Sequence, residues 1–322
     1  MVDVIIVGAG TAGLSAAIYA LRSGKSVLVL EEKSYGGQIV STPEVENYPG
    51  IKKISGFEFA TGLYEQAMEL GMEIKYARVT DIREKRIEEM DQKEAELKIA
   101  SQTKPRKIFE VETSDGTVTG SSLILATGVS KRPLNVEGEK EFIGKGISYC
   151  ATCDGAFFKG KDVAVVGGGN TALEEAFFLS NYCRKVYLIH RREELRGEAR
   201  RWKLLKAKEN VSFRLNCEVK GVQGENRLEK ILLWDKKEQK EKELSVEGIF
   251  VAIGQVPDNE AFRDVLELDR QGYLLAGEDC HTSTPGIFAA GDCRSKKIRQ
   301  LTTAAADGAV AALAACEYTD DL

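Results

Sequence analysis

One pattern occurs twice in the sequence, 159 residues apart. The first copy starts at Asp3 and is DVIIVGAGTAGLSAAIYALRSGKSVLVLEE; the second starts at Asp162 and is DVAVVGGGNTALEEAFFLSNYCRKVYLIHRR. Each copy passes from an apolar strand through a tight glycine turn into an amphipathic helix and a second apolar strand. This is the order of a βαβ nucleotide-binding unit. The chain is therefore predicted to be an α/β protein with two Rossmann-like nucleotide-binding domains.

The glycines of each copy have separate roles. The first allows the tight turn, the second lets the backbone approach a pyrophosphate, and the third position stays small so that helix and strand pack closely. A single copy could be a glycine-rich turn without a ligand, but two copies with the same spacing favour nucleotide binding. The matched positions are Gly8, Gly10 and Gly13 in the first copy and Gly167, Gly169 and Ala172 in the second.

The two copies differ at the end of the second strand, which faces the adenosine ribose of a bound dinucleotide. The first copy has Glu31 there, and a carboxylate accepts a hydrogen bond from a free ribose 2′-OH. The second has His190 followed by arginines, whose planar guanidinium groups suit a 2′-phosphate. We expect FAD or NAD in the first unit and NADP in the second. The alternatives are a surface strand end for Glu31 and a solvated helix start for the arginines, which are Arg191, Arg192 and Arg196.

Three more strands end in glycine, at residues 122–128, 248–254 and 286–292. The first two close the two nucleotide units. We expect the second domain to be inserted into the first. The expected domains are 1–129 with 257–322 for FAD, and 130–256 for NADPH and the cysteine pair described below.

The third glycine-ended strand leads to Asp292, where a carboxylate can hold a ribityl hydroxyl of FAD. Arg299 and Gln300 follow, and then LTTAAADGAVAALAA, a helix of small residues whose amino end can face the flavin ring. The alternative for this helix is simple packing against a sheet.

Composition argues against several classes of protein. The net charge of −5 argues against nucleic acid as the main partner, and no apolar run is long enough for a membrane span. The seven cysteines are an odd number and five are scattered singly, which suits a reducing cytoplasm better than a disulfide framework. The first predicted strand begins close to Met1, so we expect no signal peptide.

Two cysteines, Cys150 and Cys153, lie together in SYCATCDGAFF. Their spacing fits a metal site, a structural disulfide or a redox dithiol. A zinc site usually needs a second pair of ligands, which the sequence lacks, and a disulfide across so short a loop restricts the unfolded chain little. Beside nucleotide-binding units, the pair is better interpreted as a redox dithiol.

Over essentially its whole length the chain resembles the bacterial-type, low-molecular-weight thioredoxin reductases. Two features depart from that family's pattern: Thr11 stands where proline is more usual, and residues 83–107 are longer and more charged than expected. We interpret the charged stretch as a hairpin extension or helical excursion of the first domain. The motifs that carry the resemblance are GAGTAG, GGQ, ENYPG, ATG, CATCDG, GGGNTALEEA, HRREELR and AAGD with RQ.

The resemblance implies a role for each site residue. Cys153 faces the flavin, Cys150 exchanges with the partner's disulfide, and Asp154 moves the proton, with a helix cap or turn residue as the alternative for Asp154. The expected FAD residues are Gly8, Gly10, Gly13, Glu31, Gly37, Gln38, Asn47, Ala126, Gly128, Asp292, Arg299 and Gln300. The expected NADPH residues are Gly167, Gly169, Asn170, Thr171, His190, Arg191, Arg192 and Arg196.

The resemblance also implies a reaction, in which electrons pass from NADPH through FAD and the cysteine pair to thioredoxin or a thioredoxin-like protein. A cytoplasmic homodimer is expected, without nucleic acid, membrane or metal. The alternatives are an FAD-dependent dithiol oxidase or a ferredoxin-fed reductase of the same fold, which HRREELR and GGGNTA argue against, and a flavin-bearing module without turnover. Phe157 and Phe158 are expected to pack inside the domain or, where exposed, to suit a protein partner.

Overall fold

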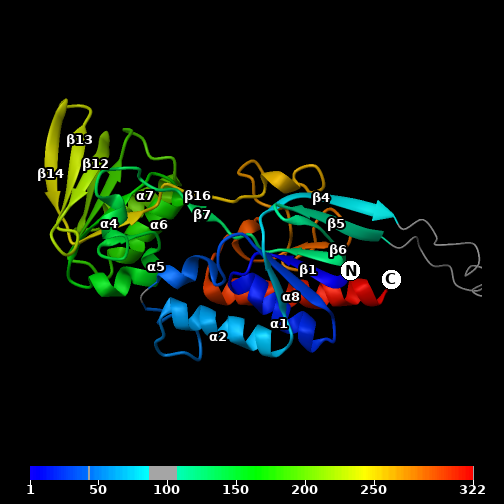
Figure 1. The fold of residues 1–322 in the computed structure, drawn as a ribbon. Helices are drawn as coiled ribbons and strands as arrows, with labels where there is room; N and C mark the ends of the chain where they lie inside the picture. Colours follow the sequence, from blue (N-terminus) through cyan, green and yellow to red (C-terminus); the bar gives the residue numbers. More distant parts are fainter. Residues whose placement is uncertain (43, 87–106, 322) are drawn as a thin grey trace, which may run out of the picture. The chain divides into compact units, whose positions relative to one another are not determined.

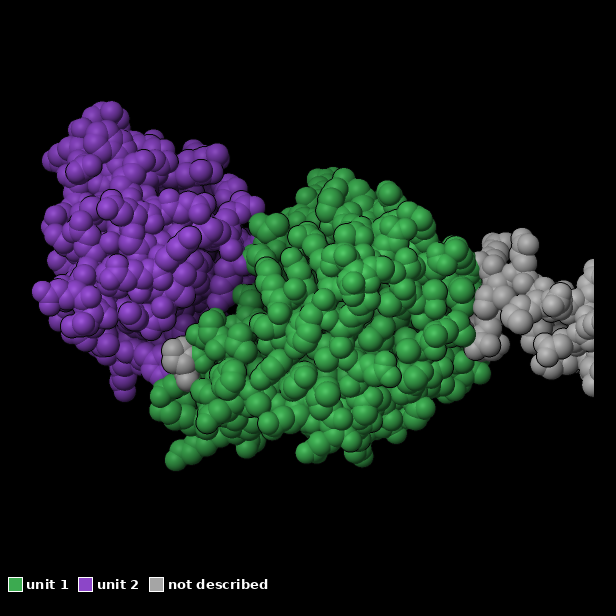
Figure 2. Space-filling view, viewed as in Figure 1, with its two compact units in different colours: residues 1–130, 256–322 green, residues 131–255 purple. Residues whose placement is uncertain are grey.

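The computed structural model describes residues 1–42, 44–86 and 107–321. The chain divides into two compact units, coloured separately in Figure 2. Unit 1 consists of Met1–Ser130 and Val256–Leu322, and unit 2 of Lys131–Gln255. Each unit contains parallel strands and helices, so the prediction of an α/β fold with two Rossmann-like units, one inserted in the other, is confirmed.

Unit 1 is built on a seven-stranded sheet of order β3-β2-β1-β6-β5-β4, in which β17 also pairs with β6. The strands around β1 are parallel, whereas β4, β5 and β6 form an antiparallel meander. The strands are β1 (Val2–Val7), β2 (Val27–Glu31), β3 (Glu73–Tyr76), β4 (Val79–Arg86), β5 (Lys107–Thr113), β6 (Gly116–Leu125) and β17 (Ile287–Ala289). The helices are α1 (Thr11–Arg22), α2 (Gly56–Glu69) and α8 (Leu301–Asp320), with short 3-10 turns η1 (Gly37–Ser41), η3 (Glu260–Phe262) and η4 (Gly291–Cys293).

Side-chain alternation along β1 divides the core of unit 1 into two layers. Val4 and Ile6 belong to the layer shared with α1 and α8, and Ile5 and Val7 to the layer on the other face of the sheet. Figure 1 shows α1, α2 and α8 gathered on one face. Helices α1 and α8 can approach closely because Gly308 has no side chain. A Cβ atom at this position would lie only 2.2 Å from the carbonyl oxygen of Ala12.

The charged stretch 83–107 joins β4 to β5, which pair in antiparallel register. Of this stretch, residues 87–106 lie outside the described residues, and so does the expected hairpin extension or helical excursion.

Unit 2 has a parallel five-stranded sheet of order β11-β10-β9-β15-β8 and an antiparallel three-stranded sheet, β12-β13-β14. A short pair, β7 (Ser130–Lys131) with β16 (Gln255–Val256), lies where the chain passes between the units. The strands are β8 (Ile147–Ser148), β9 (Asp162–Val166), β10 (Lys185–His190), β11 (Val211–Leu215), β12 (Cys217–Gln223), β13 (Lys230–Asp235), β14 (Lys240–Ser245) and β15 (Gly248–Val251). The helices are α4 (Glu139–Phe142), α5 (Ala151–Asp154), α6 (Asn170–Leu179) and α7 (Ala199–Lys206), with the 3-10 turn η2 (Gly155–Phe158).

Unit 2 repeats the two-layer core. Val163 and Val165 of β9 pack with α6, whereas Ala164 and Val166 pack with residues of the antiparallel sheet. Among the described residues, no helix combines the length and the apolar character needed to cross a membrane.

Candidate functional site

The first glycine of each repeated turn allows a close approach of two strands. Gly8 has φ +105°, and a Cβ atom there would lie 2.4 Å from the carbonyl oxygen of Ala126, at the end of β6. Gly167 has φ +156°, and its Cβ would lie 2.3 Å from the carbonyl oxygen of Ala252, after β15. The two turns are thus built in the same way, and at both positions only glycine fits.

The second glycine of each turn faces open space. A Cβ atom on Gly10 or Gly169 would meet no described atom within 4 Å, so the backbone is accessible to a ligand at both turns. In unit 1 the turn is extended by a second segment, since Gly36 N donates to Ala9 O at 2.7 Å and a Cβ on Gly37 would lie 3.2 Å from Gly10 Cα. This open, glycine-lined edge fits a pyrophosphate.

Other residues predicted for FAD meet at this carboxyl edge of unit 1. Glu31, at the end of β2, accepts from Ala9 N through Oε2 at 2.8 Å, so its carboxylate lies against the glycine turn. Gln38 Nε2 donates to the carbonyl oxygen of Val129, which places η1 beside the strand end after β6. Gly128, between these elements, has φ +68° and open space beside it.

Asp292 is the residue of unit 1 whose surroundings best fit a cofactor hydroxyl. Its Oδ1 atom is buried and has no hydrogen-bond partner among the described residues. Burial raises the pKa of this carboxyl group, although the charges of Lys296 and Arg299 oppose the shift. A buried acceptor without a donor is costly, and a ribityl hydroxyl would satisfy it, so the residues present fit FAD.

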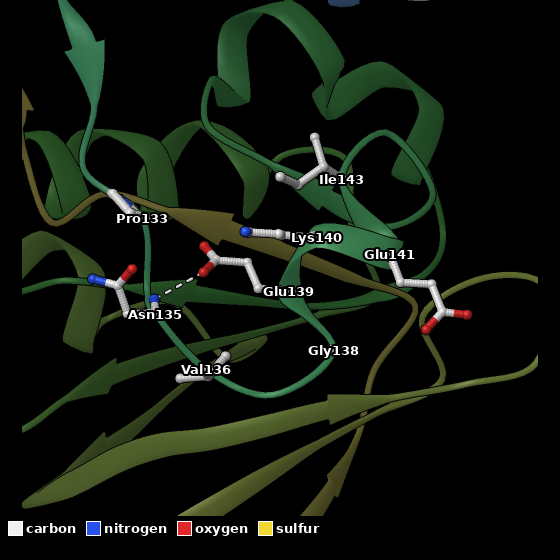
Figure 3. A pocket seen from close by; sticks show the side chains of 8 residues that line it. All are labelled: Pro133, Asn135, Val136, Gly138, Glu139, Lys140, Glu141 and Ile143. Carbon is white, nitrogen blue, oxygen red and sulfur yellow. Dashed lines mark hydrogen bonds between the residues drawn. The ribbon is translucent and has the colours of Figure 1, made fainter.

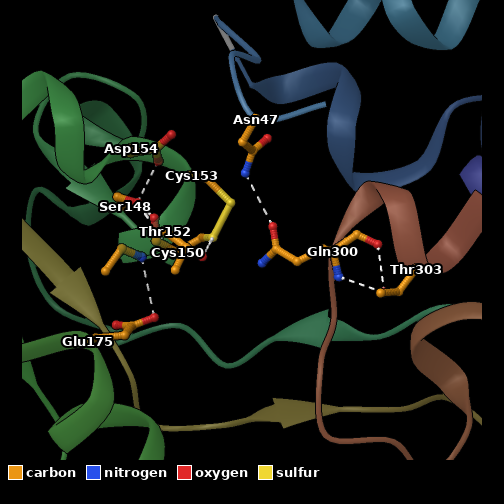
Figure 4. Close-up of a disulfide and its surroundings, with 10 residues drawn as sticks. Asn47, Ser148, Cys150, Thr152, Cys153, Asp154, Glu175, Gln300 and Thr303 are labelled. Carbon is orange, nitrogen blue, oxygen red and sulfur yellow. Dashed lines mark hydrogen bonds between the residues drawn. A yellow bond between two sulfur atoms is a disulfide. The ribbon is translucent and has the colours of Figure 1, made fainter. Parts of the chain in front are cut away.

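The start of α8 lies close to Asp292 in the sequence and is organised by side chains. Arg299 Nε donates to Asp292 O at 3.4 Å, and its guanidinium group lies 4.2 Å from the centre of the Tyr273 ring. Gln300 caps α8 together with Thr303, and Asn47 Nδ2 donates to Gln300 Oε1 at 3.3 Å (Figure 4).

A buried ion pair that the sequence analysis missed holds this region together. Arg294 is 1% exposed and binds Asp307 of α8, which also accepts from Gly291 N at 2.9 Å. Asp307 therefore fixes η4, the turn that carries Asp292. The available sequence signal was the single acidic residue, Asp307, within the small-residue segment LTTAAADGAVAALAA.

In unit 2 the residues predicted for NADPH surround the second glycine turn. His190 ends β10 beside Gly168, where a Cβ atom would lie 2.4 Å from the imidazole ring. Its Nε2 atom is buried without a partner among the described residues. Asn170 Oδ1 accepts from Glu198 N at 2.8 Å, which ties the segment after β10 to the start of α6, and Thr171 is exposed beside it.

Three arginines give this edge of unit 2 a positive charge. Arg191, Arg192 and Arg196 are exposed. The pKa of His190 is lowered by burial and then by these three charges, which shows that they gather around the end of β10. Exposed guanidinium groups beside an open glycine turn fit the 2′-phosphate of NADPH.

The cysteine pair lies at the amino end of α5. Cys150 and Cys153 form a disulfide with a Cα–Cα distance of 5.3 Å, and both residues are half-buried (Figure 4). No group of three or more metal-ligating side chains occurs among the described residues. Because the disulfide is only half-buried, a thiol of another molecule can attack it, and the disulfide then accepts two electrons.

Asp154, directly after the pair, does not cap a helix with its side chain. Its Oδ2 accepts from Ser148 Oγ at 2.5 Å, and Ser148 Oγ accepts from Cys150 N at 3.1 Å. Burial raises the pKa of Asp154, whereas the Ser148 hydrogen bond and the charge of Lys131 oppose this. Ser148 thus links the carboxylate of Asp154 to the backbone of the cysteine pair. The sequence analysis did not single out Ser148, and the only signal for this role was its place two residues before Cys150.

The two phenylalanines after the pair have different surroundings. Phe158 packs edge-on against Phe250, with ring centres 5.2 Å apart, and fills the space beside Gly248. Phe157 is 39% exposed.

A separate hollow of about 620 Å³ lies in unit 2 and is lined by none of the predicted site residues (Figure 3). It surrounds Glu139, which accepts from Leu134 N, Asn135 N and the Tyr149 hydroxyl at 2.7, 2.8 and 2.8 Å. Since Tyr149 precedes Cys150, Glu139 fixes the chain that leads into the disulfide. The hollow itself is lined by Pro133, Asn135, Val136, Gly138, Glu139, Lys140, Glu141 and Ile143.

Comparisons with known proteins confirm the predicted family. The family model for pyridine nucleotide-disulphide oxidoreductases matches residues 2–308. The curated thioredoxin reductase of Treponema pallidum (strain Nichols) is 41% identical over 321 residues, which are 99% of this chain and 98% of that protein. The thioredoxin reductase of Bacillus subtilis (strain 168) is 37% identical over 99% of this chain and 95% of its own.

The crystal structure of thioredoxin reductase from Streptococcus pyogenes MGAS5005 matches with a TM-score of 0.89 and 36% identity, covering 100% of this chain and 99% of that one. These matches cover nearly the whole chain, so the residues of both glycine turns, the arginines and the CATCDG segment lie within the matched length. The chain therefore belongs to the pyridine nucleotide-disulphide oxidoreductase family and, within it, to the thioredoxin reductases.

Proposed function

We propose that this protein is an NADPH-dependent thioredoxin-disulfide reductase, a flavoenzyme that passes electrons from NADPH through FAD and the Cys150–Cys153 disulfide to thioredoxin. The observation that carries this conclusion is the half-buried disulfide in the same compact unit as a nucleotide-binding turn, in a chain similar over its whole length to thioredoxin reductases. When bound, FAD and NADPH supply the hydride and electron-transfer chemistry.

Unit 1 binds FAD and unit 2 binds NADPH in this proposal. Support for FAD comes from the unpartnered Asp292 Oδ1 and from the open backbone at Gly10 and Gly128. Support for NADPH comes from the open backbone at Gly169 and from the exposed arginines that follow His190. The other residues predicted for each cofactor lie on the corresponding unit, and their individual roles are part of the proposal.

The chain's own chemistry is thiol–disulfide exchange. Reduction of the Cys150–Cys153 bond consumes two electrons and two protons and gives two thiols. The Cys150 thiolate attacks one sulfur of the thioredoxin disulfide, forms a mixed disulfide and releases the other thioredoxin sulfur as a thiolate. Cys153 then attacks Cys150, restores the internal disulfide and releases the second thioredoxin sulfur.

Asp154 holds the proton that moves during this exchange. Its carboxylate is linked through Ser148 to the Cys150 backbone, and its raised pKa brings it closer to the pH at which a carboxyl group can both accept and donate a proton. The assignment of Cys150 as the exchanging thiol and of Cys153 as the thiol that faces the flavin rests on the family resemblance.

The decisive experiment follows the absorbance of NADPH in the presence of oxidised thioredoxin. The proposal predicts rapid NADPH oxidation that requires thioredoxin and slower oxidation with NADH. Thiol oxidation with oxygen as the acceptor would instead identify a dithiol oxidase. Turnover with reduced ferredoxin and none with NADPH would identify a ferredoxin-fed enzyme, and no turnover with any acceptor would identify a binding module.

We further propose that the enzyme is a cytoplasmic homodimer. Five cysteines are free and buried in the described part of the chain, which suits a reducing compartment. Val310 and Leu313 of α8 are 39% and 52% exposed, and apolar side chains of this kind are commonly covered by a second subunit. Light scattering during gel filtration tests the dimer, and cell fractionation tests the compartment.

A further inference from the structure

A second carboxyl group lies beneath the disulfide, on a different element from Asp154. Glu175, in α6, accepts from Ala151 N through Oε1 at 3.4 Å (Figure 4). Ala151 N is bonded to the carbonyl carbon of Cys150, and Ala151 is fully buried. The carboxyl group of Glu175 therefore meets the backbone of the pair directly, whereas that of Asp154 reaches it through Ser148.

The other carboxyl oxygen of Glu175 has no compensating contact. Oε2 is buried and without a hydrogen-bond partner among the described residues. A buried carboxylate in this situation loses its hydration without replacement, so the protonated form is favoured. Burial is the main reason that the pKa of Glu175 is raised to about 7, and the Ala151 N–H group only partly opposes it.

The charged groups around Glu175 add to this preference. Glu174, on the same helix, and Asp154 of α5 both raise its pKa by repulsion. Glu174 is itself paired with Arg201 of α7 at 2.5 Å, and Lys131 acts on Asp154. Glu175 is thus the carboxyl group in this cluster whose charge is least compensated, and any new negative charge at the cysteine pair would raise its proton affinity further.

We propose that Glu175 stores one of the two protons that accompany reduction of the disulfide. The disulfide and the Glu175 carboxylate together accept two electrons and two protons, giving one thiol, one thiolate and a protonated Glu175. The net charge of the cluster stays at its starting value. Exchange with a partner disulfide then returns both electrons and both protons, leaving the partner as a dithiol, the internal disulfide re-formed and Glu175 ionised.

This inference rests on the proposed reductase function, which supplies the electrons. A hydrogen bond to Ala151 N alone would make Glu175 a structural anchor. Proton storage also makes the equilibrium between disulfide and dithiol depend on the ionisation of the Glu175 side chain. A thiolate can then persist at neutral pH beside a neutral carboxyl group, which favours attack on the partner.

The test measures that equilibrium in the FAD-bound enzyme without NADPH or thioredoxin. The protein is equilibrated with dithiothreitol of defined redox ratio at several pH values, and free Cys150 and Cys153 are quantified by alkylation and mass spectrometry. Glu175→Gln removes the titration and keeps an oxygen for Ala151 N, so it separates proton storage from hydrogen bonding.

The expected result is a loss of pH dependence on the alkaline side. Above about pH 7, where oxidised Glu175 is ionised, the wild type takes up an additional proton on reduction. The Glu175→Gln variant does not take up this proton, so its equilibrium constant between disulfide and dithiol changes less with pH. The difference between the two proteins is up to about tenfold per pH unit, or about 30 mV for a two-electron couple. Below about pH 6 the equilibrium constants of the two proteins change equally with pH, because Glu175 of the wild type is then protonated in both the disulfide and the dithiol state.

Glu174→Gln is the matched control, since it removes the same charge from the neighbouring, exposed position of α6. It should keep the alkaline slope of the wild type, with the change of slope moved to lower pH because the repulsion from Glu174 is removed. An unchanged slope in Glu175→Gln would overturn the proposal and leave Glu175 as a structural anchor. Because this assay needs neither NADPH nor thioredoxin, its result is distinguishable from a failure of the reductase function, which would appear as absent NADPH turnover in the wild type.

Discussion

Asp307 binds Arg294 with both carboxylate oxygens, from Oδ2 to Nε at 2.8 Å and from Oδ1 to Nη2 at 2.9 Å. Lys296 adds a contact to Oδ2 at 2.8 Å. Burial alone would raise the pKa of Asp307, but the hydrogen bonds from Arg294 and Lys296 outweigh it and lower the pKa. The pair connects α8 to η4, the turn that carries Asp292. The position of Asp292, which is proposed to bind FAD, therefore depends on this buried ion pair.

Asp307→Asn should destabilise unit 1 and weaken its retention of FAD. Removing one partner of a buried ion pair leaves the other charge unpaired and costs about 3–5 kcal/mol. Because the folded-state pKa of Asp307 is lowered, its stabilisation is present above about pH 4, the unfolded value, and is lost as the pH falls through the folded value. Thermal unfolding of both proteins at several pH values should therefore show a difference that shrinks in acid.

Glu278→Gln is the control for this variant. Glu278 also contacts Arg294, at 3.4 Å, but its side chain is 93% exposed. An exposed pair contributes about 0–1 kcal/mol, so this variant should unfold and retain FAD like the wild type. Equal effects of the two substitutions would show that the buried pair has no special role.

Arg191 and Arg192 should determine the choice of nicotinamide cofactor. Changing either to Gln removes a charge-assisted contact to the 2′-phosphate, worth about 1.5–3 kcal/mol. KM for NADPH should rise roughly ten- to a hundredfold, with little change for NADH. Arg184→Gln, at the other end of β10 and paired with Asp162 at 2.8 Å, should leave both constants unchanged. A wild type that prefers NADH would contradict the assignment of unit 2.

Much of this architecture was predictable because local rules determine it. Each glycine turn needs a positive φ at its first residue, and each strand beside it is a run of apolar residues, so Gly8 and Gly167 could be placed from spacing alone. The cysteine pair was equally visible, since its two residues are neighbours in the chain.

The features that could not be predicted depend on contacts between distant segments. Glu174 and Glu175 form an acidic pair on a helix, typical of a solvated face, and only packing against α5 buries the carboxyl group of Glu175. Arg294 lies in a polar stretch that is typical of a surface loop, yet it is 1% exposed because Asp307 compensates its charge. Burial of a charge is determined by its partner, and the partner's position is a property of the fold.

Ser148→Ala should shift the pH dependence of thioredoxin reduction upward. The Ser148 hydroxyl donates to the ionised carboxylate of Asp154, and a hydrogen bond to the charged form lowers a pKa. Without it the pKa of Asp154 rises, so the step that needs the ionised carboxylate moves to higher pH. Asp154→Asn should instead lower the rate at every pH, by about 10²–10⁴-fold for a lost general acid–base group. Rates measured across the pH range separate the two outcomes.

The two cysteines should differ in their trapping of thioredoxin. Cys153→Ser leaves Cys150 without a resolving thiol, so a mixed disulfide with thioredoxin should accumulate and be visible on non-reducing gels. Cys150→Ser should form little of it and should keep the long-wavelength absorption of a thiolate beside bound FAD, which Cys153→Ser loses. The reverse pattern would exchange the roles of the two residues.

Phe157 should contribute to thioredoxin binding, whereas its neighbour should contribute to folding. An aromatic side chain that is 39% exposed four residues after the disulfide can be covered by a docked protein. Phe157→Ala should raise KM for thioredoxin about tenfold, equivalent to about 1–2 kcal/mol, and leave the reduction of a small aromatic disulfide unchanged.

Phe158→Ala is the matched comparison, because Phe158 packs against Phe250 and leaves no room for a side chain at Gly248. Its truncation creates a cavity and should lower the free energy of unfolding by about 3 kcal/mol, with no selective effect on thioredoxin once the protein is folded. Activity toward the two substrates and unfolding midpoints distinguish the two variants. If Phe157→Ala slowed reduction of the small disulfide as much as that of thioredoxin, Phe157 would act on the disulfide itself, and another surface would have to bind the partner.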